Sequence, residues 1–506
     1  MATQHSKPDD SSPSEKSNPS KAKLDTSPTG VVKLAMPSLR LFHTADRQPF
    51  ARIWIKGHWE TYPIRSSLFA DWLSGLCYHR HGVAPAQRTV SAAISVLASD
   101  AVFANDEKQI YVRVASCDGA IYVDLANSSW EAVRITADGW EIVPHTPVIF
   151  WRPPGMQALP RPERGGAITE LRQFLNLENE DQWILYVGWL LGALQPKGPF
   201  PLLILQGVHG SAKSTNTRVL RSLLDPNEAA IRSEPGTTRD LMISAKNSRC
   251  LAFDNLSFLS SSLCDALCRL STGGGFSTRA LYTDDGEKIF QGTRPVILNG
   301  IDLGIERADL LDRAICVWPP LIGEGARETE AQFWARFEVV CPRILGNLFD
   351  IVSCTLRRLP GVRPCKLPRM ADFATAVSAA EPALGWRQGT FLEAYARNRE
   401  STSALALEAS PLVQPILRIA EHGCWQGTAT ELLGQLIAEQ LNDQIGMTRA
   451  YPRSPRQLSQ ELRRLVPNLR QLGINVEFSR APGPNSERVI TIFKAGDARD
   501  AATQPA

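Results

Sequence analysis

The sequence predicts an α/β fold built around a parallel β-sheet, and three short apolar runs are the main observations behind this prediction. Each run is followed by a polar or glycine-containing segment; the runs are Leu202–Leu205, Cys250–Phe253 and Pro295–Leu298. Continuous apolar runs of this length are typical of strands that helices cover on both faces. Helical spacing in Thr215–Leu224 supplies the alternation of strand and helix that predicts a doubly wound sheet. We expect its ligand at the carboxyl ends of the strands.

The composition bounds the class of protein. The chain has 506 residues, of which 43% are hydrophobic and 21% charged, which predicts roughly two to four globular domains. A net charge of +3 excludes a protein that coats nucleic acid through its overall charge, although a local basic face is compatible with it. The ten cysteines lack the spacing of a zinc site or a disulfide framework, which predicts reduced thiols.

No segment of the sequence predicts export or a membrane. The first residues are rich in Ser, Pro, Lys and Asp and lack the apolar run of a signal peptide. The longest apolar stretch, Trp183–Leu194, is shorter than the ~20 residues that cross a bilayer. We therefore expect a cytoplasmic protein without a membrane partner.

Changes in composition along the chain predict six segments. Residues 1–30 and 496–506 are expected to be disordered tails, because they lack the apolar side chains that offset the entropy of ordering. The predicted folded segments are an N-terminal α+β domain (31–155), a core with leading helices (156–325), a helical region (326–425) and a C-terminal domain (426–495). The first boundary follows Trp151–Gly155, where two prolines and a glycine interrupt regular structure.

Local patterns predict further elements outside the core. The expected elements are a strand at Arg52–Ile55, a helix at Ser67–Tyr78, a hairpin that joins Ile110–Val114 to Ile121–Leu125, and helices at Trp334–Leu356 and Ala371–Asn398. The hairpin is expected to turn at Asp118-Gly119, since such a dipeptide suits a tight two-residue turn.

The loop after the first apolar run has the composition of a phosphate-binding turn. Residues 207–214 read Gly-Val-His-Gly-Ser-Ala-Lys-Ser between a predicted strand and a predicted helix. Backbone N–H groups in such a turn point at phosphate oxygens; a lysine adds charge for the β and γ phosphates, and a serine hydroxyl binds Mg²⁺. The expected ATP contacts are Gly207, Gly210, Ser211, Ala212, Lys213, Ser214 and Thr215. Ala212 occupies the position at which this pattern usually has its last glycine.

Two polar residues follow the second apolar run. Asp254 is predicted to hold Mg²⁺ through water, together with Ser214. Its neighbour Asn255 stands where many such ATPases carry a glutamate that activates water, and an amide cannot accept that proton. Either another carboxylate such as Glu234 serves as the base, or hydrolysis is slow.

The third run ends in Asn299, which is expected to position the attacking water or to contact the γ-phosphate. Further along, Arg307 and Arg313 are candidates for an arginine that reaches the nucleotide of a neighbouring subunit. The alternative for either arginine is a surface ion pair.

The order and spacing of these segments resemble the ATPase core of superfamily III helicases, which are AAA+-like P-loop NTPases, and especially the phage, plasmid and poxvirus primase-helicase type. The similar segments are Gly207–Ser214, Leu251–Asn255, Leu270–Phe290, Pro295–Gly300 and the arginine-bearing run to Pro319. The resemblance implies an ATP-dependent DNA helicase that replicates a mobile element as a homo-oligomeric ring, expected to be a hexamer. It implies ATP between subunits, with Lys213, Ser214, Asp254, Asn299 and Arg313 in the roles given above.

The resemblance also implies a hairpin that contacts DNA in the central channel of the ring. The expected hairpin is Leu281–Phe290, with Arg279 and Lys288 as its DNA contacts. Its expected turn at Asp285-Gly286 is acidic, and carboxylates repel phosphate.

The C-terminal domain has the element order of a winged helix. Helices are predicted at Thr428–Gln440 and Ser454–Leu465, and strands at Asn475–Ser479 and Arg488–Phe493. Between residues 449 and 494 there are nine basic and three acidic side chains. We expect DNA contacts from Arg453, Arg456, Arg463 and Arg480. A protein-binding surface or a solvated helix face is the alternative.

Three functions are compatible with these features. The first is the helicase or translocase, with replication proteins as possible further partners. The second is a nucleotide-switched DNA-binding or assembly protein with little or no ATP turnover, which Asn255 and the acidic hairpin favour. A metabolic kinase is the third, but it would have no use for a basic winged helix.

Overall fold

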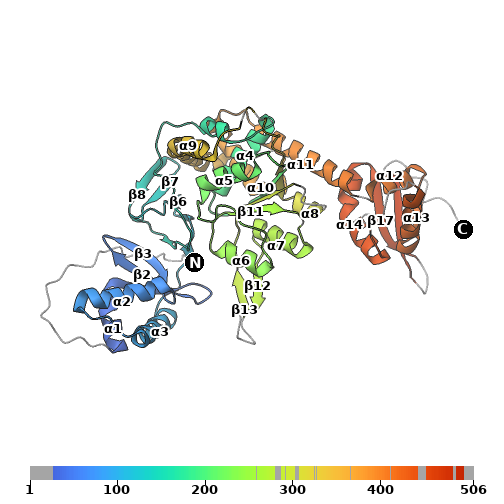
Figure 1. The fold of residues 1–506 in the computed structure, drawn as a ribbon. Coiled ribbons are helices and arrows are strands. Elements are labelled where there is room, and N and C mark those ends of the chain that lie inside the picture. The colour runs from blue at the N-terminus through green and yellow to red at the C-terminus, as the bar shows by residue number, and fades with distance from the viewer. Residues whose placement is uncertain are drawn as a thin grey trace.

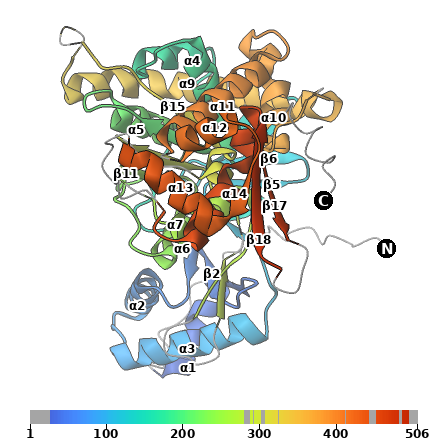
Figure 2. The same ribbon diagram turned by 90° about the vertical axis from the view of Figure 1, so that its right-hand side faces the viewer.

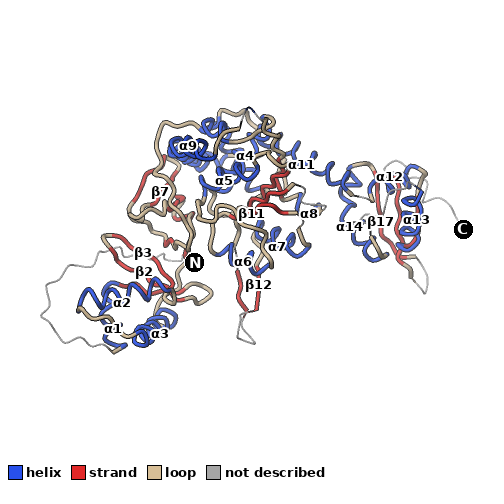
Figure 3. Tube along the Cα trace, viewed as in Figure 1, coloured by secondary structure: helices blue, strands red, loops and turns tan. Residues whose placement is uncertain are grey.

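The computed structural model describes most of the chain between residues 27 and 494. The described residues are 27–257, 259–279, 287–290, 292–301, 307–323, 325, 327–364, 366–410, 412–442, 452–481 and 486–494. A central α/β body carries an N-terminal module at one end and a C-terminal module at the other (Figure 1). Each of the three parts contains both helices and strands (Figure 3). The expected C-terminal tail and most of the expected N-terminal tail lie outside the described residues.

The central body is built on a parallel sheet of four strands. They are β10 (Leu202–Gln206), β11 (Leu251–Leu256), β14 (Val296–Gly300) and β15 (Ala314–Val317). Their order is β11-β14-β10-β15, and every pairing is parallel. The three strands predicted from the apolar runs are confirmed, and β15 is an additional edge strand. Because β14 separates β10 from β11, Asn299 stands between the glycine loop and Asp254.

Alternate side chains of these strands enter two different cores, which is why the runs are apolar throughout. Leu202 and Ile204 pack with the helices of one face, whereas Leu203 and Leu205 pack with those of the other. The first face is covered by α6 (Thr238–Lys246) and α7 (Ser261–Thr272), and the second by α4 (Glu180–Ala193), α5 (Lys213–Leu224) and α9 (Glu330–Arg358). A 3₁₀ helix, η2 (Ile168–Phe174), precedes α4. The parallel-sheet core of the predicted fold is therefore confirmed.

The prediction of one helix over Ala371–Asn398 is wrong, because a turn interrupts the helix in the middle of this range. The observed elements are α10 (Ala371–Ala380), the 3₁₀ turn η5 (Glu381–Leu384) and α11 (Thr390–Ala409). Pro382 ends the regular helix, and Gly385 adopts a left-handed φ of 69°. The break brings Phe373 against α4, where a Cβ on Gly192 would lie 2.2 Å from the Phe373 ring. The glycines that interrupt the apolar stretch of α4 thus permit close helix packing.

One helix in the described part of the chain is long and apolar enough to cross a membrane by length and composition. It comprises α9 and the 3₁₀ turn η4 (Leu359–Gly361), from Glu330 to Gly361. In its most apolar stretch of 18 residues, 56% of the residues are buried inside the protein. Leu345 and Phe349 belong to the main core. This burial is typical of a core helix, as expected for Trp334–Leu356.

The N-terminal module is a three-stranded antiparallel sheet with helices on one face. Its elements are α1 (Pro28–Ala35), η1 (Met36–Ser38), β1 (Leu39–His43), β2 (Pro49–Ile55), β3 (His58–Pro63), α2 (Ser67–His81) and α3 (Gln87–Phe103). The strand expected at Arg52–Ile55 and the helix expected at Ser67–Tyr78 are confirmed. The tail expected over residues 1–30 is too long, because the Ser27 side chain caps α1 and Pro28 occupies its first position.

A four-stranded antiparallel meander links this module to the central body. Its strands are β5 (Val114–Cys117), β6 (Ala120–Asp124), β7 (Ala132–Thr136) and β8 (Gly139–Val143), with a parallel pair, β4 (Ile110–Tyr111) and β9 (Ile149–Phe150), beside it. The predicted turn at Asp118-Gly119 is confirmed, since both residues have positive φ and join β5 to β6. The predicted first strand is wrong in part, because Ile110–Tyr111 pairs with β9 instead.

A buried ion pair fixes the meander to the central body. Arg113 and Asp225 are both almost completely buried, and Arg113 Nε donates to Asp225 Oδ1 at 3.1 Å. The same guanidinium donates to the carbonyl oxygens of Asp124 and Gln157. The second Asp225 oxygen accepts the backbone N–H groups of Arg249 and Cys250, which immediately precede β11. The pair therefore joins the meander, the end of α5 and the start of β11.

The C-terminal module has its own hydrophobic core. It consists of α12 (Val413–Glu421), β16 (Trp425–Thr428), α13 (Ala429–Asn442), α14 (Pro455–Gln471), β17 (Ile474–Arg480) and β18 (Arg488–Lys494). The predicted order of two helices and two strands is confirmed, while α12 and β16 are additions. The sheet order is β16-β18-β17. Figure 2, viewed from this side, shows α13 and α14 in front of the central body.

We predict that Arg113→Met lowers the free energy of unfolding by about 3–5 kcal/mol, because the variant leaves the Asp225 carboxylate buried without its ionic partner. Urea denaturation would measure the change. The matched control is Arg134→Met, which removes an exposed ion pair with Glu141 and should lower the free energy of unfolding much less than Arg113→Met does. Equal losses from the two variants would contradict this role for the buried pair.

Candidate nucleotide and DNA sites

The glycine loop joins the end of β10 to the start of α5. Gly207 and Gly210 have φ of 151° and 80°, and Ala212 has a φ of 59° as the residue before the helix. The left-handed region costs an alanine roughly 1–2 kcal/mol that a glycine avoids. The backbone conformation therefore explains why this position usually carries glycine in such loops, and Ala212 adopts it nonetheless. Ser211 is buried within the loop, and Thr215 lies in the first turn of α5.

Lys213 lies over the loop that precedes it. Its Nζ donates to the carbonyl oxygens of Gly207 and Val208 at 2.7 and 2.8 Å. Partial burial lowers the pKa of Lys213, and the nearby Asp254 carboxylate opposes that shift. The ammonium group thus stands at the mouth of the loop, beside the candidate metal-binding carboxylate.

Ser214 and Asp254 are brought together from different elements. The Ser214 hydroxyl, in the first turn of α5, donates to Asp254 Oδ2 at 2.6 Å. The register of β11 shifts between Phe253 and Leu256, and Asn255 in this bulge has a φ of 56° and an exposed side chain. Asparagine tolerates this conformation better than most residues do. Glu234 is also exposed, just beyond the bridge that pairs Arg232 with Phe253.

Asn299 is completely buried between the loop strand and the strand of Asp254. Its Oδ1 accepts a hydrogen bond from the Thr217 hydroxyl of α5 at 2.9 Å. Its Nδ2 is buried without a hydrogen-bond partner. An unpaired buried amide is costly, so this nitrogen has unused donor capacity beside the loop.

A residue that the sequence analysis missed supports the loop from outside. Asn176 donates from Nδ2 to the carbonyl oxygens of Ser211 and Pro320, and its backbone N–H donates to Asn216 Oδ1 at 3.0 Å. These contacts hold the loop between the segment before α4 and the segment after β15. A lone asparagine with partners 35 to 144 residues away leaves no local signal in the sequence.

The two candidate arginines lie in different surroundings from each other. Arg307 is held by contacts within the same chain, since it donates to the carboxylates of Asp265 and Asp309 and to the Ser261 carbonyl. Both ion pairs raise the pKa of Arg307, against the effect of burial. Arg313 follows the short helix α8 (Ala308–Leu311) and donates through Nη1 to the Asp309 carbonyl, while its Nε is buried without a partner.

Arg313 stands at the opposite end of the sheet from the glycine loop. Its carbonyl accepts the N–H of Leu202, the first residue of β10, whereas the loop follows the last residue of that strand. The two sites are thus separated by the length of a five-residue strand, about 16 Å.

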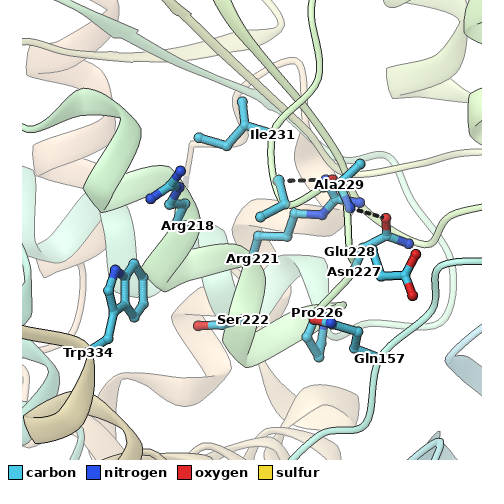
Figure 4. Close-up of a pocket in the computed structure, with 11 residues that line it drawn as sticks. Gln157, Arg218, Arg221, Ser222, Pro226, Asn227, Glu228, Ala229, Ile231 and Trp334 are labelled. Carbon is cyan, nitrogen blue, oxygen red and sulfur yellow. Dashed lines mark hydrogen bonds between the residues drawn. The ribbon is translucent and has the colours of Figure 1, made fainter. Parts of the chain in front are cut away.

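A cavity of about 390 Å³ lies along α5 without including the loop. Figure 4 shows its lining, which includes Arg218, Arg221, Asn227 and Trp334. Arg221 already donates to the carbonyl oxygens of Ala229 and Ala230. The cavity is separate from the residues expected to bind nucleotide, none of which lines it.

The residues expected to contact DNA lie in two places. Arg279 and Lys288 belong to an antiparallel pair, β12 (Phe276–Arg279) and β13 (Glu287–Phe290), in which Arg279 is opposite Glu287. The hairpin therefore begins before the predicted Leu281, and its expected tip lies outside the described residues. The four C-terminal arginines, Arg453, Arg456, Arg463 and Arg480, are all exposed, and the Arg463 guanidinium lies 3.9 Å from the Phe478 ring centroid.

The carboxylates of the core do not form a dedicated metal cage. Among the described residues, no group of three or more His, Cys, Asp or Glu side chains could together hold a metal ion. A hydroxyl and one carboxylate, such as Ser214 and Asp254, suit Mg²⁺, which usually takes its remaining ligands from water and phosphate.

Two sequence families match most of the folded chain. Residues 168–400 match the replication protein of actinomycete integrative conjugative elements, and residues 412–503 match the C-terminal domain of that replication protein. The chain belongs to this family of replication proteins. The prediction that this replication protein serves a mobile element is thereby confirmed.

Solved structures that match along most of this chain share little sequence with the replication protein. One is described as "SCCmec type IV Cch - active helicase"; it has a TM-score of 0.46 and 11% identity, and the match covers 90% of this chain and 93% of that one. Another is an apo form of the NrS-1 C-terminal region, with a TM-score of 0.38, 12% identity, and 92% and 99% of the two chains covered. No curated protein matches the sequence. The family assignment rests on the two sequence matches.

We predict that Ala212→Gly stabilises the replication protein by roughly 1 kcal/mol, because glycine adopts the left-handed conformation without a Cβ clash. Thermal or urea unfolding would measure the change. Ala335→Gly, at an exposed position inside α9, is the control and should cost about 0.5–1 kcal/mol. Destabilisation by both substitutions would contradict the strain assigned to Ala212.

Proposed function

We propose that this replication protein is an ATP-dependent DNA helicase or translocase that acts as a ring. The observation that carries the proposal is the meeting of Lys213, Ser214, Asp254 and Asn299 at the carboxyl ends of β10, β11 and β14. In an open parallel sheet this edge is the usual ligand-binding site. Membership of a family of replication proteins supports DNA as the substrate on which the energy of ATP hydrolysis is used.

In this proposal the loop N–H groups and Lys213 bind the phosphates, and Ser214 and Asp254 hold Mg²⁺. The fit is supported by the short hydrogen bond between Ser214 and Asp254 and by the buried, unpaired Nδ2 of Asn299. Bound Mg²⁺ supplies positive charge that stabilises the phosphoryl group during transfer. Asn299 Nδ2 would orient the attacking water or the γ-phosphate by donating a hydrogen bond.

A ring, expected to be hexameric, is supported by the position of Arg313. The backbone of Arg313 lies a strand length from the loop of its own chain, farther than an arginine side chain extends, so we propose that Arg313 approaches the nucleotide of another copy. Arg307 is a weaker candidate, because two carboxylates of its own subunit already bind it.

The C-terminal module is proposed to be a winged helix that contacts DNA. Leu458, Leu462, Leu465 and Leu469 bury one side of α14, and the exposed arginines occupy the remainder. Arginines on the second helix and the adjoining strands suit contacts with phosphate. We also propose domain boundaries near residues 155, 325 and 425, and a cytoplasmic location.

A second candidate function is a nucleotide-switched DNA-binding or assembly protein. The observation that favours it is Asn255, whose amide cannot accept a proton from water. This alternative predicts tight ATP binding, ATP-dependent assembly and negligible hydrolysis. A turnover above ~1 per second would exclude it.

We predict that the wild-type protein hydrolyses ATP faster when DNA is added and unwinds a forked duplex, and that Lys213→Ala abolishes both activities by removing the charge at the phosphates. A phosphate-release assay and a strand-separation assay would measure them. Lys246→Ala, which breaks an exposed ion pair with Asp46, is the control and should leave turnover unchanged. Lack of stimulation by single- and double-stranded DNA would refute the helicase proposal.

We predict that Arg313→Ala and Lys213→Ala are each inactive as single variants but regain ATP hydrolysis when mixed. A mixed ring would contain interfaces that combine an intact Lys213 from one copy with an intact Arg313 from its neighbour. Titration of one variant into the other, with ATP turnover as the readout, tests this. If activity does not return although mixed oligomers form, Arg313 does not act in trans.

A further inference from the structure

The helices α1, α2 and α3 lie on one face of the N-terminal sheet (Figure 1). The strand register places tryptophan and arginine side chains on the other face. In the strand register Arg40 is opposite Arg52, and Trp54 is opposite Trp59. Because Arg52 and Trp54 are two residues apart in β2, all four side chains project from one face. The other face of the same strands, with Leu41 and Ile53 among its residues, packs on the helices.

The four side chains contact one another across three strands. The Arg52 and Arg40 guanidinium carbons lie 5.4 and 5.9 Å from the Trp59 ring centroid. Trp54 and Trp59 meet at 5.1 Å, with their ring planes 65° apart. Both rings are half-buried, and neither belongs to a hydrophobic core cluster in the described part of the chain. Two large aromatic rings are thus kept at the surface beside positive charge.

The extent of this surface is set by its surroundings. At its inner end Phe50 packs edge-on against Trp151 at 5.9 Å, which closes that part of the face. At its outer end the exposed Lys56 lies in the turn between β2 and β3. The one carboxylate in these three strands, Glu60, projects from the opposite face, where it bonds His58 and Tyr62. The open part of the face is therefore aromatic and basic, without an acidic side chain from its own strands.

We propose that this face binds single-stranded DNA, with bases stacked on Trp54 and Trp59 and phosphates paired with Arg40, Arg52 and Lys56. Unpaired bases expose the flat surfaces that stack on aromatic rings and on guanidinium groups, whereas a duplex hides them. Arginine and lysine supply the contact with the phosphate backbone. The inference rests on the proposed function in taking DNA as the ligand. It concerns residues that lie before both family matches and apart from the nucleotide site.

The test measures binding of a fluorescein-labelled oligothymidylate to the full-length protein by fluorescence anisotropy, without nucleotide. The double variant Trp54→Ala/Trp59→Ala should bind at least about tenfold more weakly than wild type, because it loses the stacking contact of a base with each ring. Trp54→Phe/Trp59→Phe keeps two aromatic rings and should bind within about threefold of wild type. The matched control is Tyr78→Ala/Arg80→Ala, on the exposed side of α2, and it should bind as wild type does.

Two further measurements keep the result independent of folding. Arg40→Ala/Arg52→Ala retains both rings and should reduce the salt dependence of log K by about 1.4, for two lost phosphate contacts. Photocrosslinking of iododeoxyuridine-substituted DNA should label the peptide that contains Trp54 and Trp59. A variant that unfolds at the same temperature as wild type is folded, so its loss of binding comes from the changed surface side chains and not from misfolding.

The outcomes separate this inference from the proposed function. Unchanged binding by a folded Trp54→Ala/Trp59→Ala variant, or crosslinks that omit its peptide, would overturn the inference while DNA-stimulated ATP hydrolysis by wild type still supports the helicase. Crosslinks to Trp54 or Trp59 in a wild-type protein without DNA-stimulated hydrolysis would support the inference and refute the motor. A partner protein that binds this face in place of the oligonucleotide would likewise overturn it.

Discussion

The geometry of the central body depends most on the hydrogen bonds and the ion pair made by the Asp225 carboxylate. It lies at the end of α5, accepts two backbone N–H groups that precede β11, and pairs with Arg113 of the meander. The other ends of the same two elements carry Ser214 and Asp254, which meet at 2.6 Å. Because Asp225 holds one end of α5 against the start of β11, it helps to set the separation of the hydroxyl and carboxylate at the other end. One buried ion pair thus connects the meander with the candidate nucleotide site.

Local patterns predicted the strands and the glycine loop, because burial on two faces and a tight turn both impose a composition on consecutive residues. They could not predict the supports of that loop. Arg113 and Asp225 are 112 residues apart, and the contacts of Asn176 span up to 144 residues. Such contacts depend on the topology of the chain. The topology brings the region from β4 to β9, and the segment after β15, against the core. The same limit applies to the helix expected over Ala371–Asn398, whose apolar periodicity continues although Pro382 and Gly385 interrupt its backbone.

The two departures from the usual loop pattern share a backbone feature. Ala212 and Asn255 both adopt positive φ, on either side of the contact between Ser214 and Asp254. Alanine is strained in this region, whereas asparagine tolerates it. A glutamate in place of Asn255 would meet the bulge of β11 in a conformation that long side chains disfavour. The bulge therefore gives a backbone reason for asparagine at this position, in addition to any effect on the rate of hydrolysis. Strained backbone conformations such as that of Ala212 are often found at functional sites.

The N-terminal module, which carries the proposed single-strand surface, and the β12–β13 pair lie on the same side of the central body in Figures 1 and 2. If the pair contacts DNA in a channel, a strand that leaves the channel on this side passes the level of the N-terminal sheet. A stacking surface there would hold an unwound strand without reading its sequence, because every base offers a flat face. It would also explain why Trp54 and Trp59 remain outside the core although burial would stabilise them. The C-terminal arginines lie at the far end of the molecule, so duplex and single strand could be bound at different sites on one chain.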